Sequence, residues 1–219
     1  MAKVRGPLLS FSAGGQIAKT QVYSRWKGRP YSRQYVIPSN PQTDDQSLTR
    51  DVFSFLNGVY KTAPPRMTEA WDAGASGRVL TGRNLFIKDN LPLLRGTLSV
   101  PVTDNDDMVW SPGARAGFPA ASATPTPGND QVSIAIVAPT LPDGWTIVEA
   151  VAAVMVEEDP HSGTNYAVYS GFDATSTYAV VITGLPDSTD MVGGAWFKYL
   201  RPDGKNAYGR SLPVAFTTT

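Results

Sequence analysis

The chain has 219 residues, of which 42% are hydrophobic and 17% are charged, a composition typical of a folded protein with one large core or two small ones. It contains no cysteine, which excludes disulfides, thiol nucleophiles and thiolate metal sites. The 20 glycines and 18 prolines argue against a mainly helical protein, and the net charge of zero argues against a uniformly basic nucleic-acid-binding protein.

The two halves of the chain differ sharply in charge. Residues 1–100 contain 14 Lys/Arg against 6 Asp/Glu, a net of +8, whereas residues 101–219 contain 5 against 13, a net of −8. No acidic residue precedes Asp44. This division predicts two separate bodies, of which the basic one meets a negatively charged surface: a neighbouring protein, a second copy of this chain, or nucleic acid.

The sequence gives no sign of a membrane partner. No apolar run approaches the roughly 20 residues that cross a bilayer, and the first residues lack an apolar stretch long enough for a secretory signal. We therefore expect a protein made and used in the cytosol, or released only by lysis.

Residues 16–37 predict a β-hairpin. The segments QIAKTQVYSRW and RPYSRQYVI are rich in β-branched and aromatic residues and flank a turn at Lys27-Gly28. A two-stranded ribbon is marginal alone in water, so we expect this one to lie on another surface. If the turn does not slip the register, a period of two places these basic residues on one face: Arg25, Lys27, Arg29 and Arg33.

Three helices are predicted after the hairpin. Thr43 and Gln46 match a capping box that opens a helix running to about Lys61, with an apolar stripe at helical spacing. Pro64-Pro65 begins a shorter second helix. A third is expected over about residues 79–89, and Pro92 is expected to end it.

Residues 101–128 are predicted to form a junction between an N-terminal domain of residues 1–100 and a C-terminal domain of residues 129–219. The segment is loaded with Pro, Gly, Ala, Ser and Thr and has no sustained periodicity. Trp110 and Phe118 nevertheless argue against a free linker throughout, because large aromatic side chains pack against something.

The last ninety residues predict an antiparallel β-sandwich of six or seven short strands, including VSIAIVA, TIVEAVAAVMV and MVGGAWFKYL. The segment TYAVVITGLPDSTDMVGGAWFKYL resembles the later strands of a fibronectin type III or immunoglobulin-like module, which implies a fold and an adhesive use but no chemistry. The expected fold class is therefore an α+β N-terminal domain, with a β-hairpin plus two or three helices, followed by an all-β Ig/fibronectin-III-like sandwich.

The segment GGQIAKTQVYSRWKGRPYSRQYVIPSNPQTDDQSLTR resembles a pattern of small structural proteins of tailed bacteriophages and prophages. The shared features are a glycine pair, a Trp-Lys-Gly-Arg turn, and Pro-x-Asn-Pro-x-Thr with a Gln before a helix. The resemblance covers about residues 6–50, extends more weakly to NLFIKDNLPLLRG, and implies a virion protein. The interface residues that we predict from the hairpin and this pattern are Arg25, Trp26, Lys27, Arg29, Tyr31, Arg33, Asn40, Gln46 and Arg50.

The sequence offers little for catalysis or for cofactor binding. His161 is the one histidine, and an exposed acidic loop is a better interpretation of EEDPHSGTN than a metal site. Residues 104–107 (DNDD) lack the Gly and the distant Glu of an EF-hand, so a solvated loop is favoured over calcium. Neither a nucleophile elbow nor a Walker motif is present. We expect no enzyme, no catalytic residue, no metal and no cofactor.

These observations favour a non-enzymatic virion protein, synthesised in the host cytoplasm, that decorates or cements a capsid through its basic N-terminal domain. The alternatives are a tail or head–tail connector protein, and a DNA-binding accessory protein that uses the hairpin. The hairpin face itself has three interpretations: a solvated surface, a protein contact, or a nucleic-acid contact. Protein contact is favoured because Arg, Tyr and Trp are enriched at interfaces. The expected partners are major capsid or tail proteins and further copies of the chain in an oligomer or symmetric array.

Overall fold

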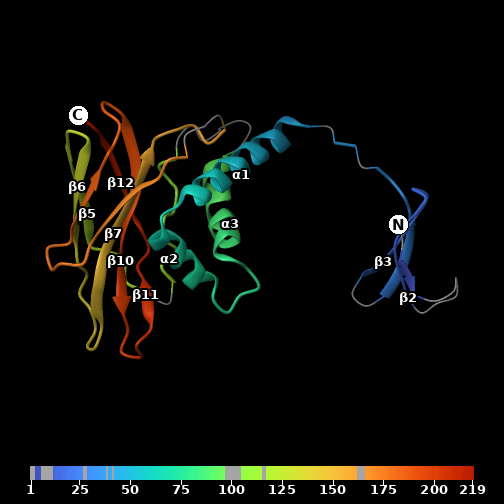
Figure 1. Ribbon diagram of the computed structural model, residues 1–219, viewed down its shortest axis with the longest axis horizontal. Helices are drawn as coiled ribbons and strands as arrows, with labels where there is room; N and C mark the ends of the chain where they lie inside the picture. Colours follow the sequence, from blue (N-terminus) through green and yellow to red (C-terminus); the bar gives the residue numbers. More distant parts are fainter. Residues whose placement is uncertain are drawn as a thin grey trace. The chain divides into compact units, whose positions relative to one another are not determined.

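The computed structural model describes residues 3–5, 12–26, 29–37, 39–40, 42–96, 105–114, 117–161 and 166–219. The chain divides into two compact units, Met1–Gln42 and Thr43–Thr219. Their helices and strands are labelled in Figure 1.

The first unit contains a four-stranded antiparallel sheet with strand order β1-β2-β3-β4. The predicted hairpin is present as the β3–β4 pair, but its first strand is shorter than expected. A turn at residues 18–20 separates β2 from β3, with Ala18 and Lys19 at positive φ. The strands are β1 Lys3–Arg5, β2 Ser12–Ile17, β3 Gln21–Trp26 and β4 Arg29–Gln34.

The register of β3 and β4 corrects the predicted arrangement of the basic residues. Position 26 pairs with position 29, and position 25 pairs with position 30. Directly paired positions share a face and successive positions alternate, so position 25 lies on the opposite face from positions 29 and 33. The expectation of a single basic face was therefore wrong. Because two residues separate the paired positions 26 and 29, even-numbered positions of β3 share a face with odd-numbered positions of β4. Lys27 lies outside the described residues.

The side chains that the structure describes in the first unit form no core. Side chains are described for residues 14–24 and 31–37, and none of these is buried. Val36 and Ile37 are 67% and 75% exposed, and Ile17 and Tyr31 are also exposed. A sheet needs one covered face for independent stability, so this sheet is suited to packing against a partner.

Three helices open the second unit: α1 Asp44–Thr62, α2 Pro65–Ala75 and α3 Gly82–Arg95. The predicted start of α1 is confirmed, but the Thr43 side chain makes no capping hydrogen bond. The predicted end of α3 was wrong, since Pro92 lies inside the helix, which runs on to Arg95. The start of α3 is set by Thr81, whose side chain accepts a hydrogen bond from the Asn84 amide at 3.3 Å.

Two antiparallel sheets follow. One has the order β5-β6-β9, and the other has the order β11-β10-β7-β8 with β12 also paired to β10. The predicted β-sandwich is therefore present, and β5 extends it into the segment expected to be a junction. The strands are β5 Ser122–Gly128, β6 Gln131–Val137, β7 Thr146–Val156, β8 Tyr169–Asp173, β9 Ala179–Thr183, β10 Asp190–Leu200, β11 Asn206–Tyr208 and β12 Leu212–Thr217.

The larger sheet is covered on both faces. Val151, Ala153 and Met155 of β7 pack in one core with the helices, while alternate residues of β7 pack in a second core with the smaller sheet. This explains why β7 reads as a continuous apolar run. Figure 1 shows α2 and α3 beside the larger sheet.

The grouping of elements differs from the expected domain boundaries. The helices share a core with the sandwich rather than with the hairpin, because Trp71 and Phe86 pack in the same cluster as Trp196 of β10. Trp110 of the expected junction is 1% exposed, and its carbonyl accepts a hydrogen bond from Trp71 Nε1 at 2.9 Å. The boundary between units therefore lies at residues 42/43, and the structure is a mixed α+β protein with a β-sandwich.

Candidate interaction surfaces

The division of charge coincides with the division of structure. Residues 1–42 contain seven Lys/Arg and no Asp or Glu, and residues 43–219 contain 12 Lys/Arg against 19 Asp/Glu. The first unit therefore carries +7 and the second −7. The boundary at residues 42/43 therefore separates a unit that contains no Asp or Glu. A division at residue 100 does not show this, because residues 43–100 contain six acidic side chains.

The nine predicted interface residues do not form one site in a single unit. Arg25, Trp26, Arg29, Tyr31 and Arg33 lie in the β3–β4 pair. Asn40 follows that sheet and is exposed, while Gln46 and Arg50 are exposed residues of α1 in the second unit. Tyr31 and Arg33 are exposed on the face that also carries positions 26 and 29.

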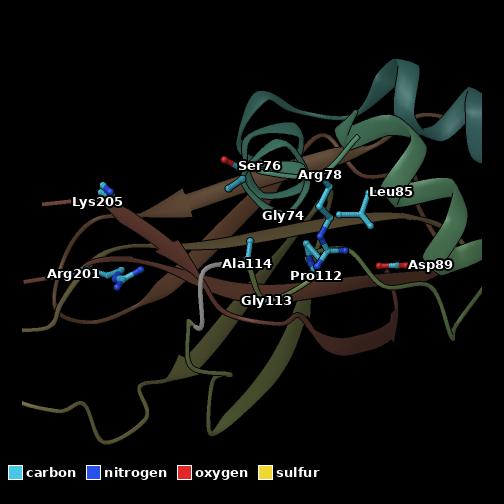
Figure 2. Close-up of a pocket in the computed structure, with 11 residues that line it drawn as sticks. Gly74, Ser76, Arg78, Leu85, Asp89, Pro112, Gly113, Ala114, Arg201 and Lys205 are labelled. Carbon is cyan, nitrogen blue, oxygen red and sulfur yellow. The ribbon is translucent and has the colours of Figure 1, made fainter. Parts of the chain in front are cut away.

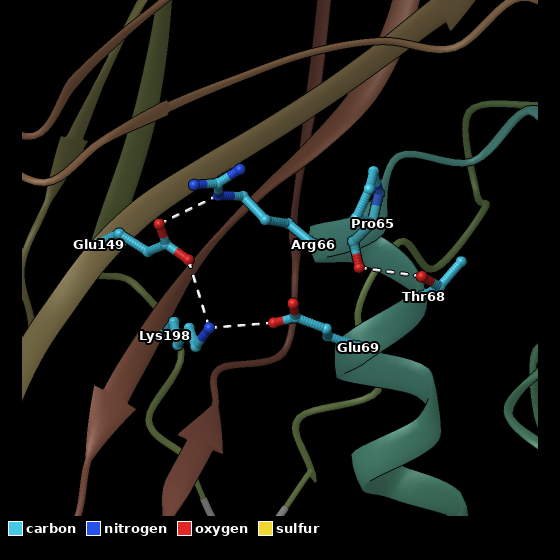
Figure 3. A network of polar contacts seen from close by, with 6 residues as sticks. All are labelled: Pro65, Arg66, Thr68, Glu69, Glu149 and Lys198. Carbon is cyan, nitrogen blue, oxygen red and sulfur yellow. Dashed lines mark hydrogen bonds and ion pairs between the residues drawn. The ribbon is translucent and has the colours of Figure 1, made fainter.

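A polar network that the sequence did not reveal fixes α2 to the larger sheet (Figure 3). Arg66 Nε donates a hydrogen bond to Glu149 Oε2 at 3.0 Å, and Lys198 Nζ lies 3.6 Å from Glu149 Oε1. Lys198 also donates to Glu69 Oε2 at 3.0 Å, and the Arg66 guanidinium lies 3.5 Å from the centre of the Phe172 ring. These contacts join α2 to three strands, β7, β8 and β10, and so fix the helix on the sheet.

Burial and charge oppose each other at Lys198. Burial favours the neutral amine, but the hydrogen bond to Glu69 and the negative charges of Glu69 and Glu149 favour the ammonium, so the pKa of Lys198 is raised above its ordinary value of 10.5. The ammonium is therefore the form that the folded protein stabilises at neutral pH.

Two adjoining hollows lie where the helices meet the sheet. The larger has a volume of about 690 Å³ and lies among the end of α2, the α2–α3 loop, residues 112–114 and the β10–β11 turn (Figure 2). The smaller has about 380 Å³ and shares Asp89 and Pro112 with the larger. The combined lining has one carboxylate, Asp89, and five cations: Arg78, Lys88, Arg201, Lys205 and Arg210. These residues are scattered through the sequence, and no local pattern brought them together.

Two acidic loops, around residues 157–161 and at residues 104–107, are the candidate metal sites of the sequence. Within the described part of the chain, no three His, Asp or Glu side chains are placed to hold a metal ion. Asp104, part of the loop weighed as a calcium site, lies outside the described residues. None of the helices that the structure describes is long and apolar enough to cross a membrane.

Comparisons with known proteins leave the family open. No family model and no curated protein matches this chain. Solved structures give partial similarities over 47% of the chain: one titled "Myokine structure" (12% identity, TM-score 0.34, 96% of that chain), a redesigned β-sandwich protein (14%, 0.34, 90%) and domains d3–d4 of the rat CD45 extracellular region (15%, 0.33, 51%). These similarities are too low to bear on function.

Proposed function

We propose that this chain is a non-enzymatic structural protein of a tailed-phage particle, which decorates or cements the capsid through its N-terminal sheet. The sheet's lack of buried side chains, among those described in residues 14–24 and 31–37, is the observation that carries the proposal. A sheet with both faces accessible gains stability when a partner covers one of them. The resemblance of residues 6–50 to the phage pattern supports a particle as that partner.

The charge of the first unit favours an acidic protein surface as its binding site. Seven positive side chains and no negative one give long-range attraction to such a surface and orient the approach. Tyr31 and Arg33 supply the residue types that anchor protein interfaces. The outer strands β1 and β4 each have one unpaired edge within the described sheet, which offers a second mode of docking by strand addition.

The second unit would then project from the particle or contact neighbouring copies. We assign its sandwich to the Ig/fibronectin-III-like modules, whose adhesive use suits repeated contacts on a particle surface. In this proposal the chain resides in the virion, bound to the major capsid or tail protein, with its copies in an array. The net charge of −7 on the second unit opposes the alternative of a DNA-binding protein.

The first experiment is quantitative mass spectrometry of purified particles, scaled to the major shell protein. A copy number comparable with that of the shell protein supports decoration, and a number matching a single ring indicates a tail or connector position. Absence from the particle overturns the proposal. A mobility-shift assay with duplex DNA tests the alternative, because specific retention of DNA by the purified chain would favour the accessory role.

A further inference from the structure

The two hollows described above form one groove along α3. They share Asp89 and Pro112, and Figure 2 places Arg201 and Lys205 at one side of the larger hollow and Arg78 with Asp89 at the other. Its lining also includes apolar side chains such as Leu85, Pro92 and Leu93. A groove lined by both cations and apolar side chains is suited to an acidic protein segment.

The groove is a positive area on a negative unit. It contains five of the 12 Lys/Arg of residues 43–219, against one lining carboxylate, Asp89. Arg201 lies 3.5 Å from Asp203 of the same turn. No described residue forms an ion pair with the other four cations, which are Arg78, Lys88, Lys205 and Arg210.

The opposite end of the sandwich is acidic. The Leu185 amide donates to the Asp130 carbonyl at 3.1 Å, and the Glu157 amide donates to the Asp190 carbonyl at 2.9 Å. The Glu158 amide donates to Asn105 Oδ1 at 3.1 Å. These contacts bring the β5–β6 turn, the β9–β10 loop and the end of β7 together. No Lys or Arg occurs between residues 116 and 197, the part of the sequence that supplies these turns and the end of β7.

Strand β10 separates the two surfaces. It begins at Asp190 in the acidic end and ends at Leu200, directly before Arg201 of the groove. Its 11 residues span about 35 Å at about 3.3 Å per residue. The groove and the acidic turns therefore lie at opposite ends of β10.

We propose that the groove lined by Arg78 and Lys205 binds the acidic end of the sandwich, around Asp187 and Glu157, of a second copy of this chain. The inference rests on the proposed array of copies and names the contact between neighbours. A carboxylate-bearing protein surface fits the groove because the acidic turns are opposite to the lining cations in charge and the groove also offers apolar side chains. The contact joins different surfaces of the two copies, so it repeats head to tail and builds a ring or an open chain.

Sedimentation velocity of the full-length chain over a range of concentrations tests this contact. We expect association that weakens as salt is raised, because salt screens charges beyond roughly 8–10 Å. The groove variant Arg78→Glu/Lys205→Glu and the acidic-end variant Glu157→Lys/Asp187→Lys should each remain monomeric. A 1:1 mixture of the two variants should associate again, because the unaltered acidic end of one variant meets the unaltered groove of the other. Combining all four reversals in one chain should restore association.

The controls are Lys61→Glu and Asp51→Lys, single reversals at exposed α1 residues outside the groove and the acidic end. Both should associate as the unaltered chain does, and circular dichroism should show every variant folded. A monomeric unaltered chain, or a mixture that stays monomeric, overturns the inference. Loss of association in Arg33→Glu but not in the groove variant also overturns it, because the N-terminal sheet would then be the occupant. Binding to particles is measured separately, so either proposal can fail alone.

Discussion

Lys198 lies directly opposite Glu149 in the register of β10 and β7, with its Nζ 3.6 Å from Glu149 Oε1. Cross-strand pairs of opposite charge stabilise a sheet, and here the pair also reaches α2 through Arg66 and Glu69. The same two side chains therefore link β7 to β10 and connect both strands to α2.

Replacing Glu149 with Gln should lower the free energy of unfolding by about 2–4 kcal/mol. The Glu149 side chain is largely buried, so the change leaves Arg66 and Lys198 with less compensation of charge in a partly dry site. Urea unfolding followed by circular dichroism measures the change. Glu69→Gln is the matched control, because Glu69 is half exposed and its pair with Lys198 should contribute less than about 1 kcal/mol. Equal losses of unfolding free energy in the two variants would show that Glu149 contributes no more to the stability of the network than Glu69 does.

Stability should fall in alkaline solution, above about pH 10. Burial raises the pKa of Tyr199 above its ordinary value of 10.0, and the pKa of Lys198 lies above 10.5. For both groups the folded state holds the proton more tightly than the unfolded chain, so their stabilisation is complete below the ordinary pKa values. It is lost as the pH rises through the raised ones.

The Tyr199→Phe variant isolates the tyrosine contribution to this alkaline loss. It removes the hydrogen bond from the Tyr199 hydroxyl to the Phe118 carbonyl, 2.8 Å long, and lowers stability by about 1 kcal/mol at neutral pH. Between pH 9 and 11 its stability should decline less steeply than that of the unaltered chain. Parallel declines would show that the phenol does not contribute to the pH dependence.

Arg33→Glu and Arg25→Glu make the same charge change on opposite faces of one hairpin. The face with positions 26, 29, 31 and 33 combines basic and aromatic residues, so Arg33→Glu should weaken particle binding by about tenfold or more and Arg25→Glu by less. Binding of purified chain to particles that lack it gives the comparison. Equal effects would favour docking through a sheet edge, where neither face is preferred.

Gly194→Ala should destabilise the second unit by about 1–3 kcal/mol. A Cβ at this position in β10 would lie 2.7 Å from Trp110 Cδ1, inside a packed core that has no room to move. Gly128→Ala at the end of β5 is the control, since its Cβ would meet nothing nearer than 3.5 Å. Thermal unfolding should show a lower midpoint for the first variant and little change for the second.

Local patterns were sufficient to predict many individual elements. In the predicted apolar stripe of α1, Leu48 is half-buried and Val52, Phe55, Leu56 and Val59 are buried, as their helical spacing requires. Pro65 begins α2 as predicted. The strand signals of the sandwich were also correct. The prediction that Pro92 ends α3 was wrong. The helix continues to Arg95, because the other residues of its last turns stabilise it by more than the loss of one amide donor at Pro92 destabilises it. The residues around β1 and β2 contain no sequence pattern that distinguished these two strands from a loop.

The amino-acid sequence by itself determined the division of charge, the repertoire of helices and strands, and the absence of cysteine chemistry, because these depend on composition and on short periodic patterns. Only the tertiary structure decided which surfaces those residues form. The register across residues 27 and 28 places Arg25 and Arg33 on opposite faces, a core around Trp71 and Trp196 joins the helices to the sandwich, and distant cations meet in one groove. These outcomes depend on pairing and packing between segments far apart in the chain, and no short sequence pattern indicates which segments make such contacts.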